Sequence, residues 1–208
     1  MPPALLLDLD KTLVNVEDHT DYCAAVEAVR AHLGELADPP DVPATSWGRC
    51  AVQAMSVLVA LAGQDHWGHV SSIIEGFEAA GAERAEPMPG LRAFLEATAD
   101  RPRAIVTLCG PRSAHRVCER FGVPIEAVIT RAPEMPIKPA PHQVQAALEA
   151  LGVAASDAVM IGDSSWDEGA AHAAGVRFVG IDNGRPTRQF GEGTPVVATL
   201  LDALPLLA

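Results

Sequence analysis

The sequence has little positive charge, few cysteines and no long apolar run. Its 208 residues contain 15 Lys and Arg against 27 Asp and Glu, which gives a formal net charge of −12. Proteins whose main partner is DNA or RNA need a basic surface for the phosphate backbone. The acidic balance therefore argues against a nucleic-acid partner.

The longest apolar stretch, residues 50–62, contains Gln53 and Ser56 and is shorter than the roughly 20 residues that cross a bilayer. The N-terminal apolar run lacks the basic start of a secretory signal and reaches Asp8 early. We therefore expect neither a signal peptide nor a membrane segment.

The four cysteines are scattered along the chain, with no CxxC pair and no Cys/His set at zinc spacing. They are Cys23, Cys50, Cys109 and Cys118. This pattern predicts neither a disulfide framework nor a structural zinc site, and it indicates a reducing, cytoplasmic compartment.

What is present is a globular composition, with 49% hydrophobic and 20% charged residues. Short apolar runs alternate with helical patterns, which predicts a doubly wound, mainly parallel, Rossmann-like α/β sheet. The runs are residues 4–9, 104–108, 127–130, 158–161 and 176–181, and the helical patterns are 90–98, 111–121, 141–151 and 166–174.

Residues 15–85 interrupt this alternation, because they contain helical patterns and no strand candidate. The patterns at 18–34, 48–63 and 64–81 each end in glycine, and the proline-rich residues 38–43 predict a loop. We predict an all-helical domain at 15–85, inserted into an α/β core made of residues 1–14 and 86–208.

Polar residues follow four of the predicted strands, and in an open parallel sheet such residues meet at the ligand site. They are Asp8, Asp10, Thr107, Lys138, Asp163 and Asp167. Crowded carboxylates repel one another unless a cation lies between them, and oxygen ligands suit Mg²⁺. A metal, a lysine and a hydroxyl around one spare carboxylate describe a site for phosphoryl transfer. Lys138 and Lys11 are the only lysines in the chain.

Four segments resemble the motifs of the haloacid dehalogenase superfamily, in the family's order. Residues 8–12 (DLDKT) resemble its DxDxT signature, Ile105-Val106-Thr107 its second motif, residues 138–141 (KPAP) its third, and residues 162–175, beginning GDSSWD, its fourth. Met88-Pro89-Gly90 matches the turn by which a helical cap rejoins the core. The resemblance is to the phosphatase branch with a cap after the first motif, which includes phosphoglycolate phosphatase-like and β-phosphoglucomutase-like proteins.

This resemblance implies a Mg²⁺-dependent phosphatase acting on a small phosphate monoester. Asp8 would be the nucleophile and Asp10 the general acid and base. Mg²⁺ would be held by Asp8, Asp163 and the backbone carbonyl of Asp10, and Asp167 would hold its waters. The phosphoryl group would contact Thr107, Cys109, Gly110 and Lys138. We expect a monomer or homodimer.

Two positions differ from the family pattern. Both lie where the chain passes from the core into the predicted cap, so they bear on which substrate is bound. Lys11 stands where the family usually has Gly, and Asn15 stands where it usually has Asp. We expect specificity to lie in the cap and in residues 15–21, with Glu17, Asp18 and His19 as candidate contacts.

Cys109 precedes a predicted helix N-terminus, where a thiolate is favoured, so we expect its alkylation to block the site. A sugar-phosphate mutase shares the four motifs and stays an alternative. A non-catalytic module would lack the nucleophile or the acid, and a dinucleotide-binding oxidoreductase would need a GxGxxG segment, which is absent. Asp10 argues against the dehalogenases, and the lysine-free cap argues against the phosphonate-cleaving enzymes.

Overall fold

The computed structural model describes residues 2–34, 42, 44–123, 125–184 and 189–207. Of the predicted loop at 38–43, all but Val42 lies outside these ranges. Among the described residues, we find no helix with the length and apolar character needed to cross a membrane.

One six-stranded sheet with the order β3-β2-β1-β4-β5-β6 forms the centre of the molecule, and every neighbouring pair is parallel. Five strands fall on the predicted apolar runs. The sixth, β6, has two residues and was not predicted. The strands are β1 (Ala4–Leu7), β2 (Arg103–Val106), β3 (Ala127–Ile129), β4 (Ala158–Gly162), β5 (Arg177–Ile181) and β6 (Val196–Val197).

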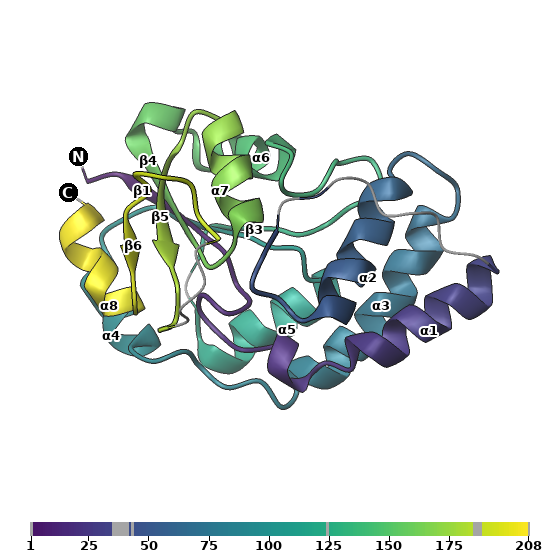
Figure 1. The fold of residues 1–208 in the computed structure, drawn as a ribbon. Coiled ribbons are helices and arrows are strands. Elements are labelled where there is room, and N and C mark those ends of the chain that lie inside the picture. The colour runs from purple at the N-terminus through teal and green to yellow at the C-terminus, as the bar shows by residue number, and fades with distance from the viewer. Residues whose placement is uncertain (1, 35–41, 43, 124, 185–188, 208) are drawn as a thin grey trace.

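Helices cover both faces of the sheet, which explains why its strands are apolar at consecutive positions. In β1, Leu5 and Leu7 join the core on one face, and Ala4 and Leu6 join the core on the other. One face carries α4 (Leu91–Ala97), α5 (Pro111–Phe121) and α8 (Leu200–Ala203), and the other carries α6 (His142–Leu151) and α7 (Ser165–Ala173) (Figure 1). Two short 3₁₀ helices, Ala155–Asp157 and Leu204–Leu207, complete the core. The predicted doubly wound α/β fold is confirmed.

Three helices inserted between β1 and β2 lie together beside the sheet, as predicted (Figure 1). They are α1 (Tyr22–Leu33), α2 (Arg49–Ala60) and α3 (Trp67–Ala82), and the 3₁₀ helix Glu17–His19 precedes them. They pack on an apolar cluster that includes Val26, Leu58 and Ile74. We refer to α1–α3 as the helical insertion.

The chain leaves the sheet and returns to it at adjacent points. The backbone N–H of Asn15 donates to the carbonyl of Glu86 (3.0 Å), and the N–H of Glu86 donates to Asn15 Oδ1 (2.6 Å). The side chain of Asn15, which differs from the family pattern, therefore links the segment that leaves the sheet to the segment that returns to it. The domain boundaries at 15 and 85 stay a prediction.

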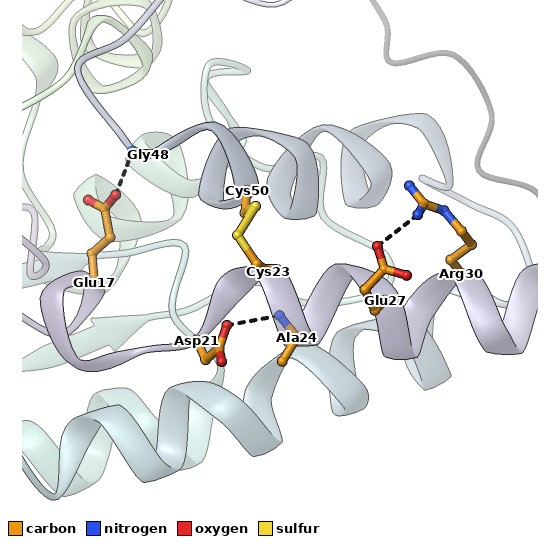
Figure 2. The surroundings of a disulfide bond; sticks show 8 residues. All are labelled: Glu17, Asp21, Cys23, Ala24, Glu27, Arg30, Gly48 and Cys50. Atoms are coloured by element: carbon orange, nitrogen blue, oxygen red, sulfur yellow. Dashed lines mark hydrogen bonds and ion pairs between the residues drawn. A yellow bond between two sulfur atoms is a disulfide. The ribbon is translucent and has the colours of Figure 1, made fainter.

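A disulfide joins the helical insertion internally, so the prediction that the cysteines form no disulfide is wrong. Cys23 at the start of α1 bonds to Cys50 at the start of α2, at a sequence separation of 27 (Figure 2). Only packing brings the two helix starts together, and their spacing carries no signature. The scattered cysteines therefore no longer support the expected reducing compartment. Cys109 and Cys118 are free thiols, and both are buried.

Replacing both Cys23 and Cys50 by Ser should lower the free energy of unfolding by about 3 kcal/mol, because the cross-link restricts the unfolded chain. Urea denaturation with and without dithiothreitol measures this difference. The reductant should destabilise the wild type and leave the double variant unchanged. A wild type that is insensitive to the reductant and shows four thiols after unfolding would contradict the bond.

Candidate active site

The predicted site residues gather at the carboxyl ends of the central strands. Asp8 directly follows β1, and its backbone N–H donates to the carbonyl of Ile161 in β4 (2.9 Å). Thr107 follows β2, and its N–H donates to the carbonyl of Ile129 in β3 (2.9 Å). Sheet hydrogen bonding thus sets the spacing of the first polar residue after each strand.

The ammonium group of Lys138 lies at the centre of the site and is almost fully buried. It donates to Asp8 Oδ1 (2.8 Å), to Asp167 Oδ1 (2.6 Å) and to the backbone carbonyl of Val106 (2.8 Å). Burial lowers the pKa of Lys138, but the Asp167 and Asp8 carboxylates outweigh it and raise this pKa above its usual value. Lys138 is therefore a permanent cation.

Gln143 on α6 places Lys138 against the second strand. Its Oε1 accepts the backbone N–H of Lys138 (3.0 Å), and its Nε2 donates to the carbonyl of Thr107 (2.9 Å). This fully buried amide joins the segments that resemble the second and third motifs. Sequence reasoning missed it, although it lies five residues after Lys138.

Three buried carboxylates, those of Asp8, Asp163 and Asp167, each place one oxygen within 4.8 Å of the others. Burial and the Asp167 charge raise the pKa of Asp8 to about 7, although Lys138 opposes them. Asp167 Oδ2 also accepts from the N–H (3.1 Å) and the hydroxyl (2.5 Å) of Ser164, which caps α7. Three clustered carboxylate oxygens are hard ligands, so this donor set suits a hard divalent cation such as Mg²⁺.

Asp10 stands apart from this cluster, in the turn that leads to the helical insertion. Its Oδ1 accepts the backbone N–H of Glu17 (3.0 Å). Burial, followed by the Glu17 carboxylate, raises the pKa of Asp10 to about 8. An aspartic acid in this position holds its proton near neutral pH.

The departure at position 11 has a backbone consequence. Lys11 has a φ of 61°, in the left-handed region where glycine is favoured, and its N–H donates to the carbonyl of Val14 (2.6 Å). Its ammonium pairs with the exposed Asp18 carboxylate. Lys11 and Asp18 are therefore engaged with each other, outside the residues that line the site cavity.

A cavity of about 40 Å³ lies between the strand ends and the helical insertion. Its lining combines five of the predicted site residues with residues of the helical insertion and of the segments that flank it. It is formed by Asp8, Asp10, Glu17, Tyr22, Trp47, Ala51, Thr107, Leu108, Cys109 and Lys138. Asp163, Asp167 and Gly110 lie outside this lining.

Contacts with Glu78 bear on two expectations for the loop after β2. Cys109 is buried, and burial together with the Glu78 carboxylate raises its pKa well above the usual value, which disfavours a thiolate there. The backbone N–H of Gly110 donates to Glu78 Oε2 (2.9 Å) and is not available for a phosphoryl oxygen. The sequence concealed both facts because Glu78 comes from a distant helix.

A fully buried ion pair between Glu78 on α3 and Arg131, just after β3, fastens the helical insertion to the sheet. Arg131 donates to Glu78 Oε1 (2.7 Å), and so does the hydroxyl of Tyr22 (3.2 Å). Sequence reasoning missed this pair. The available signal was spacing, since Glu78 lies four residues after Ile74 and eleven after Trp67, on the buried face of α3.

Glu78→Gln should lower the free energy of unfolding by about 3–5 kcal/mol, because it leaves the Arg131 guanidinium buried without its counter-charge. Chemical denaturation measures the change. Glu83→Gln, at the C-terminal end of α3, is the matched control, because it removes an exposed pair with Arg116 and should cost little. Equal effects from the two variants would contradict the assignment.

The sheet and its buried carboxylates define an α/β enzyme with its site at the carboxyl ends of parallel strands. A model of the haloacid dehalogenase-like hydrolases matches residues 2–175. The phosphoglycolate phosphatase of Pseudomonas syringae pv. tomato is 30% identical over 215 residues, covering 89% of this chain and 73% of that protein. The chain belongs to the haloacid dehalogenase-like hydrolases, within their phosphatase branch.

Solved structures share the fold. A putative phosphoglycolate phosphatase from Lactobacillus plantarum has a TM-score of 0.73 at 24% identity, covering 99% of both chains. CbbY from Rhodobacter sphaeroides, solved in complex with phosphate, has a TM-score of 0.72 at 19% identity, covering 98% of this chain and 96% of that one.

Proposed function

We propose that this enzyme hydrolyses a small phosphate monoester through an aspartyl-phosphate formed on Asp8. The observation that carries the proposal is the contact of Lys138 with Asp8, beside the buried cluster of Asp8, Asp163 and Asp167. A cation next to the nucleophile offsets the charge that an incoming phosphoryl group adds.

In the first step, an oxygen of Asp8 attacks phosphorus and the bond from phosphorus to the ester oxygen breaks. Asp10 lines the same cavity and gives its proton to the departing alcohol. In the second step, water attacks the aspartyl-phosphate and gives a proton to Asp10. Inorganic phosphate leaves, and Asp8 is restored.

Mg²⁺ would be held by Asp8, Asp163 and the backbone carbonyl of Asp10, with Asp167 holding its waters, and it would supply positive charge to the phosphoryl oxygens. Lys138 keeps Asp8 and Asp167 oriented through its two ion pairs. The hydroxyl of Thr107 lies at the cavity and can contact the phosphoryl group.

The helical insertion would act as a cap over this site. Tyr22 and Ala51 belong to it, and both line the cavity. Residues 15 and 86 lie together, which suits a hinge at the predicted boundaries of 15–85. Closure would exclude water from the first step.

The curated relatives make phosphoglycolate the first substrate to test. The cavity of about 40 Å³ is far smaller than pockets that enclose drug-sized ligands, roughly 300–1,000 Å³, which argues against a large ester.

Asp8→Asn should lower phosphate release to the background of the assay, because an amide does not attack phosphorus. Release of inorganic phosphate from a panel of small esters measures the effect. Asp157→Asn, at an exposed position beyond the cavity, is the matched control and should keep full activity. Full activity in Asp8→Asn would refute the mechanism, and an isomeric sugar phosphate in place of free phosphate would indicate a mutase.

Removing divalent metal with EDTA should abolish activity, and Mg²⁺ should restore it. Asp163→Asn should weaken Mg²⁺ binding, because it removes one charged oxygen ligand from the cluster. Calorimetric titration with Mg²⁺ measures binding apart from turnover. Wild-type affinity in Asp163→Asn would count against the proposed site.

A further inference from the structure

The cavity has two chemically different sides. Asp8, Thr107 and Lys138 form the side that the proposed function gives to the phosphoryl group. The rest of the lining, which we call the alcohol side, would receive the alcohol of the ester. Besides Asp10 and Cys109, it is formed by Glu17, Tyr22, Trp47, Ala51 and Leu108.

Among its described residues, the alcohol side carries a carboxylate and no cation. Lys138 is the one cation among the described residues of the lining, and its ammonium is engaged by Asp8 and Asp167. Tyr22 is neutral, because burial and the nearby Glu78 raise its pKa well above the usual value. Among the described residues of this side, Glu17 is therefore the charged group.

Glu17 is held in place from two directions. Its Oε1 accepts the backbone N–H of Gly48 at the start of α2 (2.7 Å; Figure 2), and its own backbone N–H donates to Asp10 (3.0 Å). The Glu17 carboxylate lies near enough to Asp10 to raise its pKa, so in the proposed mechanism it would lie close to the alcohol that Asp10 protonates.

A nearby cation lies outside this lining. Arg49 is exposed and belongs to a neighbouring hollow, which shares Glu17, Tyr22 and Ala51 with the cavity. An anionic alcohol group in the cavity would therefore meet Glu17 with no partner of opposite charge among the described lining residues that are not already paired. Like charges brought together in a partly dry site are costly, which rejects such esters.

We infer that Glu17 selects esters whose alcohol ends in an ammonium or hydroxyl group, and rejects those that end in a carboxylate or a second phosphate. The inference rests on the proposed function, because it assumes that the phosphoryl group lies against Asp8. It makes phosphoglycolate a poor substrate of this enzyme, although relatives are named for it.

Three esters of similar length separate charge from size: phosphoethanolamine, 2-hydroxyethyl phosphate and phosphoglycolate, which end in an ammonium, a hydroxyl and a carboxylate. With Mg²⁺ present, kcat/KM for each of the first two should exceed that for phosphoglycolate by about tenfold or more, since opposite and like charges differ by at least that much at close range.

Glu17→Gln keeps an acceptor for Gly48 and removes the charge. It should lower the ratio of kcat/KM for phosphoethanolamine to that for phosphoglycolate by about tenfold. The ratio is the readout because a merely structural change would affect both esters alike. Glu27→Gln removes an exposed carboxylate on α1, paired with Arg30, and should leave the ratio unchanged (Figure 2). Arg49→Gln should leave it unchanged as well.

The results that would contradict the selection by Glu17 differ from those that would contradict the phosphatase mechanism. A wild type that prefers phosphoglycolate, with activity lost in Asp8→Asn, would overturn the selection by Glu17 and leave the phosphatase mechanism standing. A ratio that responds to Arg49→Gln and not to Glu17→Gln would also overturn it. Hydrolysis that persists in Asp8→Asn for all three esters would refute the proposed function, and the selection with it.

Discussion

The buried ammonium of Lys138 is the interaction on which the site depends. Parallel strands that end at one edge bring Asp8, Asp163 and Asp167 together, and carboxylates in such proximity repel one another. Lys138 contacts two of them and also the backbone of the second strand. It therefore stabilises the folded state and keeps the Asp8 nucleophile oriented. The clustered carboxylate oxygens are what makes a divalent cation fit.

A second buried pair extends this arrangement to the helical insertion. Glu78 and Arg131 join α3 to the segment after β3, and the same carboxylate accepts from Gly110 and Tyr22. The loop after β2 and the wall of the cavity are thus positioned by one carboxylate. In the same region, the Cys23–Cys50 bond holds α1 against α2, next to two residues of the cavity wall. The shape of the site is a property of both parts of the molecule.

Much of the fold was predictable because local rules agree with the tertiary arrangement. A strand covered on both faces must be apolar throughout, so the runs ending before Asp8 and Asp163 revealed β1 and β4. The polar residues that follow these runs had to meet at one edge, which predicted the site. The two-residue β6 carried too little pattern to be recognised. The opening charge of −12 is compatible with an anionic substrate, because Lys138 acts locally within a buried site.

The sequence by itself determined the class of fold, the helical insertion and the identity of the chemical groups, because hydrophobic period and strand-end residues are local properties. Only the tertiary structure decided the partners of those groups. Glu78 accepts the N–H of Gly110, and burial together with Glu78 raises the pKa of Cys109. Cys23 and Cys50 form a disulfide. Such pairings join positions far apart in the chain, and burial gives them their strength, since charges out of water interact more strongly. The spacing of residues along a chain contains neither their distance in space nor their exposure to solvent.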